Sequence, residues 1–159
     1  SKWPDEVLGW VQLTATGGHP GNDRQHAAIR RWNAPCEMTI RIHSKLVHQR
    51  AAGDGVRAFI VASHQGLLAS ESVHESTAEL NVDALEVSAG DTIDFLVDIG
   101  DILNSDEHLW TQTIEPASGK SPLVWNSESD FPRKTFHKLD AWEQLAQVLF
   151  CTNEFTFVD

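Results

Sequence analysis

The pattern that most restricts the fold of this chain is a regular alternation of apolar and polar residues between Met38 and His48. Apolar side chains at Met38, Ile40 and Ile42 alternate with polar ones at the positions between them and at Lys45. Successive side chains of a β-strand point to opposite faces, so a period of two is typical of a strand that is buried on one side. We therefore predict a half-buried strand over this segment.

Seven further extended runs are separated by residues that favour turns. Glycine, proline, asparagine and aspartate gather between the runs, as in Gly53-Asp54-Gly55 and Gly90-Asp91. The runs cover residues 7–14, 28–34, 56–62, 67–74, 80–87, 92–98 and 108–114. Eight short strands at this spacing favour an antiparallel sandwich over alternating strand–helix units. We predict an all-β, antiparallel jelly-roll β-sandwich, the natural version with eight strands.

The last part of the chain differs in character and divides the sequence into three ranges. Residues 1–115 are predicted to form the β-sandwich module, and residues 116–139, which contain several Pro and Ser, an extended linker. Residues 140–159 are predicted to form one C-terminal α-helix and a tail. Asp140 and Glu143 fit the N-cap and N3 positions of the helix.

This C-terminal helix has an apolar stripe formed by Trp142, Leu145, Ala146, Val148 and Leu149. A helix of this length is not stable alone in water, and exposed apolar stripes seldom stay exposed. We expect the stripe to pack on the sandwich or on a second copy of the chain in a homodimer.

Composition excludes several classes of partner. Twelve Lys and Arg stand against 23 Asp and Glu, which gives 12 − 23 = −11 at pH 7. A chain of this charge is a poor partner for the phosphates of nucleic acid. No apolar run approaches the roughly 20 residues that a membrane-spanning helix needs. Cys36 and Cys151 are predicted to be either two free thiols or one disulfide, because their spacing matches no metal or haem motif.

Motifs for catalysis are missing, and the chain is predicted not to be an enzyme. Gly119-Lys120-Ser121 lacks the first glycine of a phosphate loop, and His74-Glu75 lacks the second histidine of a zinc-protease motif. Asp94 and Asp98 lie about 13 Å apart on one strand. This exceeds the roughly 9.5 Å limit for a pair of glycosidase carboxylates, so a hydrolase would need a cross-strand pair.

No metal site is predicted from the spacing of the histidines and carboxylates. The acidic loops nevertheless carry oxygens of the kind that calcium prefers. The sequence leaves open whether a structural calcium ion lies near Asp54, Asp98 or Asp106.

The residues predicted to face the core are Ile40, Ile42, Ala58, Ile60, Ile93 and Phe95. A ligand-binding face is predicted from the residues that alternate with these core positions and from two tryptophans. Aromatic rings can lie against the apolar face of a sugar, and charged groups can bind its hydroxyls. The candidate ligand-binding residues are Arg41, His43, Arg57, Phe59, Asp94, Trp110 and Trp32. The alternative is that Arg41, Arg57 and Asp94 form a cross-strand charge ladder on a solvated sheet, with the tryptophans in the core or at an edge.

Several motifs together resemble the C-terminal region of large planctomycete proteins that join a c-type cytochrome segment to planctomycete-specific domains of unknown function. The resemblance begins near residue 8 and covers nearly the whole chain. It is carried by Leu8-Gly9-Trp10-Val11-Gln12-Leu13-Thr14 and Gly17-Gly18-His19-Pro20-Gly21-Asn22-Asp23, and by residues 31–35, 53–58, 90–95, 142–149 and 153–159. Cys151 and Phe59 depart from the residue types that are usual in such proteins.

The resemblance implies a galactose-binding-like sandwich that serves as a carbohydrate-binding module of a longer exported protein. That protein would lie in the periplasm or on the cell surface, with polysaccharide as a partner. Haem c would belong only to its N-terminal part, so this chain would carry no cofactor. The alternative is a structural interaction module, which packs on neighbouring domains, such as the preceding helical domain, and has no ligand of its own.

Overall fold

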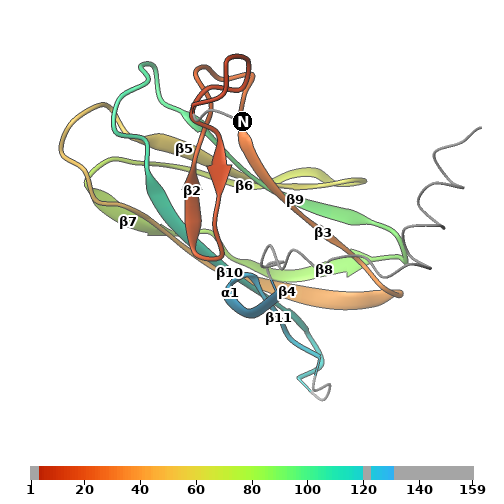
Figure 1. Cartoon of the computed structure of the whole chain (residues 1–159). Helices are drawn as coiled ribbons and strands as arrows, with labels where there is room; N and C mark the ends of the chain where they lie inside the picture. The colour runs from red at the N-terminus through yellow and green to blue at the C-terminus, as the bar shows by residue number, and fades with distance from the viewer. Residues whose placement is uncertain (1–3, 120–122, 131–159) are drawn as a thin grey trace, which may run out of the picture.

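The computed structural model describes residues 4–119 and 123–130, which form two antiparallel β-sheets (Figure 1). This confirms an all-β sandwich. The elements are β1 (Gln12–Leu13), β2 (Gly17–His19), β3 (Ala28–Asn33), β4 (Met38–His48), β5 (Val56–Ala62), β6 (Gly66–Val73), β7 (Ser76–Glu79), β8 (Val82–Val87), β9 (Thr92–Ile99), β10 (His108–Pro116), β11 (Trp125–Asn126) and α1 (Ser127–Asp130).

The larger sheet is built around β4 and β10. Its order is β1-β2-β10-β4-β7, with β11 paired to the C-terminal part of β10 and β8 paired to β4. The long pairing of β4 with β10 sets Ile114 opposite Ile42 and Trp110 opposite Leu46. Because these four residues share the inner face, the alternation seen in the sequence becomes one wall of the core.

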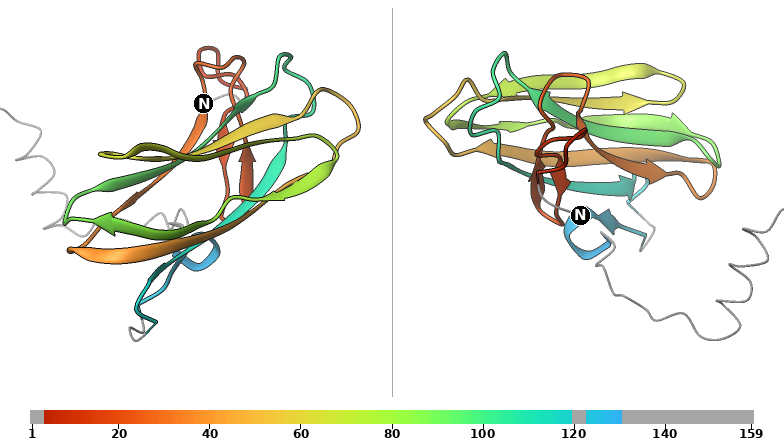
Figure 2. Two further views of the ribbon diagram at one scale, coloured as in Figure 1. Left: turned by 180° about the vertical axis from the view of Figure 1, so that it is seen from behind. Right: turned by 45° about the horizontal axis from the view of Figure 1, so that its top comes forward.

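The smaller sheet has the order β3-β9-β5-β6 and lies across the core from the larger one (Figure 2). Leu96 of β9 stands between Ile29 of β3 and Phe59 of β5. Asp94 is likewise opposite Arg31 on β3 and Val61 on β5. The outer face of this sheet therefore carries alternating apolar and charged rows.

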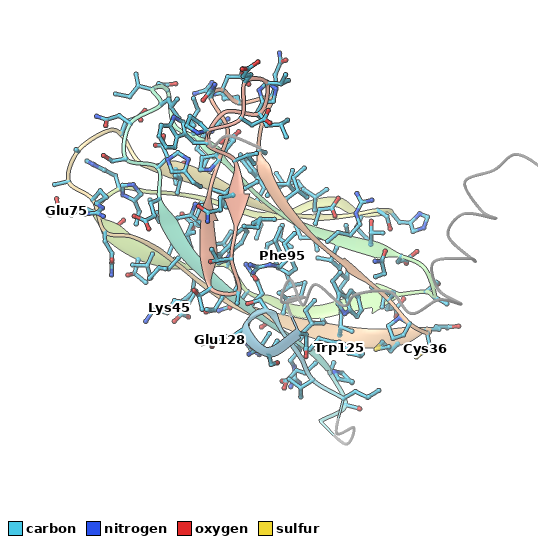
Figure 3. All side chains as sticks on the ribbon, viewed as in Figure 1. Cys36, Lys45, Glu75, Phe95, Trp125 and Glu128 are labelled. Atoms are coloured by element: carbon cyan, nitrogen blue, oxygen red, sulfur yellow. The ribbon has the colours of Figure 1, made fainter. Side chains whose placement is uncertain are left out.

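The core lies between the sheets and contains the residues whose inward orientation the sequence predicts. These residues are Ile40, Ile42, Ala58, Ile60, Ile93 and Phe95, all at most 3% exposed. Phe95 lies between the two sheets (Figure 3). Its ring meets that of Trp110 edge to face, with 5.6 Å between ring centroids. Side chains from both sheets thus close one continuous hydrophobic core.

Two predicted strands differ from the structure. Within residues 7–14 only Gln12–Leu13 is a strand, and it pairs with β2, which lies in the range predicted as a loop. The predicted strand 80–87 is preceded by the separate strand β7, and both β7 and β8 pair with β4. Between them the side chain of Asn81 accepts the backbone N–H of Ser44 at 3.1 Å, in place of a ladder bond.

Residues 125–130, within the range predicted as a linker, carry β11 and α1. Trp125 pairs with Ile114 of β10, which adds this segment to the larger sheet. The backbone N–H of Gln112 donates to the Ser127 hydroxyl at 3.0 Å, and the Asn126 side chain accepts the N–H of Glu128 at 2.8 Å. The predicted C-terminal helix lies outside the described residues. No helix in the described part of the chain is long and apolar enough to cross a membrane.

Candidate functional site

The seven residues predicted to bind ligand lie in four separate places. Arg41 and His43 project from β4 on the outer face of the larger sheet, whereas Arg57, Phe59 and Asp94 lie on the outer face of the smaller one. Trp32 lies at the edge strand β3, and Trp110 lies in the core. The structure therefore does not bring these residues together in one site.

Trp110 corrects the expectation of an exposed ring. It is 2% exposed and packs on Phe95, because the alternation of β10 places it on the inner face with His108, Gln112 and Ile114. A ring enclosed in this way offers no plane to a ligand. Its assignment as a core residue was the alternative interpretation of the sequence.

The outer face of the smaller sheet carries two bidentate ion pairs. Arg31 binds both carboxylate oxygens of Asp94 at 2.7 Å, and Arg57 binds those of Asp98 at 2.8 and 2.5 Å. The hydrogen bond to each carboxylate raises the pKa of both guanidinium groups. The Arg57 guanidinium also lies 5.6 Å from the centre of the Phe59 ring.

The predicted charge ladder of Arg41, Arg57 and Asp94 is not formed as such. Arg57 and Asp94 lie on this face in cross-strand ion pairs, but their partners are Asp98 and Arg31. Arg41 lies on the other sheet, opposite Glu115. His43 lies 3.9 Å from the same glutamate, on an exposed surface. Each of the two carboxylates, Asp94 and Asp98, thus accepts two hydrogen bonds from one arginine.

A groove of about 840 Å³ opens at one end of the sandwich, and we call it the end groove. Its walls come from the β1–β2 hairpin, the β4–β5 loop, the β9–β10 loop and the start of β10. The lining side chains include Trp10, Gln12, His19, Arg50, Asn104 and Glu107. Segments far apart in the sequence therefore meet at this end.

Asp54 holds the loops of the end groove in place. Its carboxylate accepts the backbone N–H of Asp101 at 2.5 Å and that of Ile102 at 3.4 Å, and the first of these bonds lowers the pKa of Asp54. Gly53 has a φ of +86°, and a Cβ at this position would overlap the carbonyl oxygen of Asn104. Only glycine fits so close to the neighbouring backbone.

The end groove combines one aromatic plane with several polar groups. Trp10 is 37% exposed, and its ring centre lies 6.3 Å from that of His19. The Nδ1 atom of His19 lies 2.6 Å from the Pro20 carbonyl, so its N–H donates there and Nε2 is left for another partner. Arg50 and Glu107 form an exposed ion pair at 3.3 Å. Such a surface can bind a ligand that has both an apolar face and hydroxyl groups.

Beneath the end groove lies a layer of buried polar residues. The ring of His48 is held on both sides, because its Nε2–H donates to the Ser105 carbonyl at 2.8 Å and its Nδ1 accepts the backbone N–H of Glu75 at 3.3 Å. Burial lowers the pKa of His108 to about 4. Asp106 is 0% exposed, and burial raises its pKa. Neither oxygen of Asp106 has a hydrogen-bond partner among the described residues.

The three aspartates considered for calcium lie in different environments. Asp54 is engaged by backbone N–H groups, Asp98 by Arg57, and Asp106 is enclosed in the buried layer. Within residues 4–119 and 123–130, no three histidine, cysteine, aspartate or glutamate side chains are grouped in a way that could hold a metal ion.

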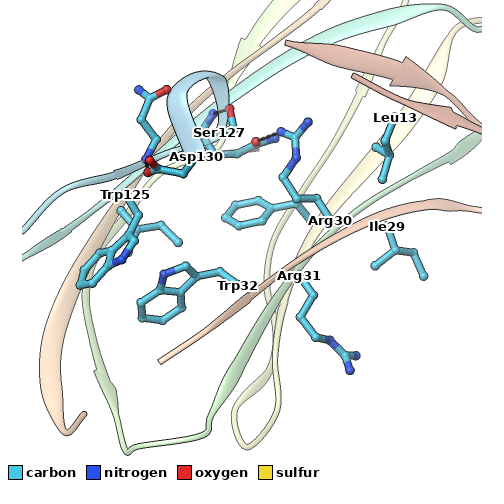
Figure 4. Close-up of a pocket in the computed structure, with 12 residues that line it drawn as sticks. Leu13, Ile29, Arg30, Arg31, Trp32, Trp125, Ser127 and Asp130 are labelled. Atoms are coloured by element: carbon cyan, nitrogen blue, oxygen red, sulfur yellow. Dashed lines mark hydrogen bonds between the residues drawn. The ribbon is translucent and has the colours of Figure 1, made fainter. Parts of the chain in front are cut away.

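A second, smaller cavity of about 290 Å³ lies between the edges of the two sheets, and we call it the tryptophan cleft (Figure 4). The rings of Trp32 on β3 and Trp125 on β11 meet edge to face there, with ring centroids 5.3 Å apart. Its other apolar lining residues are Leu13, Ile29, Phe95 and Ile114. Arg30 crosses beside the cleft, donating to the Gln112 side chain and to the Thr14 carbonyl.

Most residues of the two cavities escape prediction from the sequence. The end groove draws its side chains from four segments, each an ordinary turn or strand end, so only the strand pairing brings them together. Trp125 stood in the range predicted as a linker. A tryptophan within a Pro- and Ser-rich range was the one available signal that this range packs on the sandwich.

Comparisons with other proteins were made at the levels of family, sequence and structure. The chain matches no protein-family model, no curated protein and no solved structure.

Proposed function

We propose that this chain is a non-catalytic carbohydrate-binding module of the jelly-roll, galactose-binding-like type, and that the end groove is its binding site. The observation that carries this proposal is the exposed ring of Trp10 in a groove whose lining also includes histidine, arginine, glutamate and amide side chains, together with Leu103 and Leu109. A sugar ring has an apolar face of C–H groups and a rim of hydroxyls, so it needs both kinds of contact.

The size and charge of the end groove favour a short stretch of an uncharged glycan. Its volume of about 840 Å³ lies within the roughly 300–1,000 Å³ range of small-molecule sites. Arg50 is paired with Glu107, and the whole chain carries −11 charges at pH 7. This field repels sulfated or carboxylated polysaccharides, so neutral glycans are the expected ligands.

A glycan array, followed by titration calorimetry of the best neutral oligosaccharide, tests the proposal. We expect Trp10→Ala to weaken binding by about tenfold or more, because truncating a central aromatic contact is costly. Phe59→Ala is the matched control, since it removes an aromatic ring from the outer face of the smaller sheet and should leave affinity unchanged. Loss of binding in the Phe59 variant alone would move the site to that face, and no binding by the wild-type chain would refute the function.

We also propose that this module belongs to a larger exported protein. The motifs that resemble planctomycete cytochrome-linked proteins support a larger exported protein in the periplasm or on the cell surface. In that protein a polysaccharide would be the ligand, a helical domain the neighbour, and haem c would be held by the N-terminal part alone.

A structural interaction module is the second candidate function, and the outer face of the smaller sheet favours it. Ile29, Leu96 and Phe59 form an apolar row across three strands, and Ile29 is 47% exposed. The two bidentate arginine pairs flank this row. Phe59→Asp should then weaken assembly with the neighbouring domain of the longer protein and leave glycan retention intact.

A further inference from the structure

The tryptophan cleft differs in chemistry from the end groove. Six apolar side chains line it, and two of them are the rings of Trp32 and Trp125. The nearby polar groups are already engaged, since Arg30 donates to Gln112 and to the Thr14 carbonyl. A cleft of this kind gains most from burying another apolar side chain and offers little to hydroxyl groups.

The described part of the chain ends at this cleft. Asp130, the last residue of α1, is itself one of the lining residues, and residues 131–159 follow it directly. The stripe begins at Trp142, so residues 131–141 are the connection, and 11 residues can span up to roughly 36 Å. That reach exceeds the size of the cleft, so the segment can return to it without strain.

The sequence of this segment fits the cleft in hydrophobicity. Trp142, Leu145 and Leu149 follow the spacing of one helix face. Residues 140–159 contain four Asp and Glu and no Lys or Arg. The cleft has no excess negative charge that would repel this acidic segment, because Arg31 is paired with Asp94 and Arg30 balances Asp130.

We propose that the tryptophan cleft is the docking site of the chain's own C-terminal segment, with the Trp142, Leu145 and Leu149 stripe packed against Trp32 and Trp125. A tethered segment acts at an effective concentration in the millimolar range, so it outcompetes a free ligand of similar affinity.

The two cysteines of the chain provide a built-in test. Cys36 is exposed in the turn after β3, four residues from Trp32, hence within roughly 14 Å of it along the chain. Cys151 follows the stripe by two residues. A bismaleimide cross-linker is added to the full-length chain at low concentration, and the adduct is identified by mass spectrometry of the monomer. We expect a Cys36–Cys151 link in yield far above that of the urea-unfolded chain.

Variants separate docking from chance encounters. Leu145→Glu places a charge in the stripe and should lower the intramolecular yield about tenfold, which corresponds to about 1.4 kcal/mol. Trp125→Ala should act in the same direction, with circular dichroism used to verify that the sandwich is folded. Trp10→Ala is the matched control and should leave the yield unchanged.

Three outcomes overturn the proposal. The first is a native yield equal to the unfolded baseline, and the second is a yield that Leu145→Glu does not change. The third is a link that forms only between two molecules, which would show that a second copy takes the cleft. Because glycan binding is tested at Trp10 and docking at Leu145, either proposal can fail without the other.

Discussion

At the scale of single residues, the buried polar layer beneath the end groove affects the stability of the fold. Asp106, in the β9–β10 loop, and His108, the first residue of β10, are both buried, and burial shifts their pKa values in opposite directions. In both cases the neutral form is favoured, because a charge in an apolar surrounding loses its hydration. The layer therefore links the stability of this end of the molecule to pH.

His108 should make the fold sensitive to mild acid. Its pKa is about 4 in the folded chain, against an ordinary value of 6.5. A depressed pKa gives stability that is fully present above pH 6.5 and is lost as the pH falls toward 4. A pKa difference of this size corresponds to about 3 kcal/mol. Urea unfolding between pH 4 and 7 should show a loss of this order, and His108→Gln should flatten the curve. An unchanged slope in the variant would assign the acid sensitivity to other groups.

Asp106 should change the stability of the fold with pH in the opposite direction. Its folded pKa is raised above 3.8, so its contribution favours the fold at low pH and turns into a cost as the pH rises through the folded pKa. Asp106→Asn removes the buried charge and should raise the free energy of unfolding at pH 7 by about 1–3 kcal/mol, with no gain below pH 3.8. Denaturant titrations at the two pH values measure this. A loss of stability at pH 7 would show instead that a cation or another partner neutralises the carboxylate.

At the scale of elements, the loops of the end groove depend on the close approach of two backbones. The β4–β5 loop touches the β9–β10 loop at Gly53, and Asp54 then binds two backbone N–H groups of the same loop. The alternation of apolar and polar residues predicts the regular strands, but the contact between these two loops requires glycine at position 53. The position of the groove wall thus rests on two consecutive residues.

Gly53→Ala tests this contact against a matched control. A Cβ at residue 53 would overlap the Asn104 carbonyl oxygen, whereas Gly66 has a similar positive φ and a Cβ there would meet no atom within 4 Å. Gly66→Ala should therefore cost only the backbone strain of about 1 kcal/mol. Gly53→Ala should cost clearly more and should also weaken glycan binding. Equal melting temperatures for the two variants would mean that the two loops do not meet as described.

At the scale of the whole molecule, the chain uses its surfaces in different ways. The inner faces of both sheets form the core, and the outer face of the smaller sheet carries satisfied ion pairs beside an apolar row. The end of the sandwich holds the end groove, and its open edge holds the tryptophan cleft. A sandwich can present several independent surfaces because its core is closed by the sheets alone.

The sequence by itself determined which residues face inward. The alternation at Ile40, Ile42, Ile60 and Phe95 is a local property of the sequence. Because one face of each strand must be buried, the strand has little freedom to turn its other face inward. Partners across strands are not local, because pairing joins residues far apart in the chain. Arg57 met Asp98, Trp32 met Trp125, and Trp10 met His19 only once the strands had paired and the loops had packed. Tertiary structure alone therefore decided which side chains share a cavity. Trp110 is in the core because β10, a strand within the larger sheet, turns that face toward the smaller sheet.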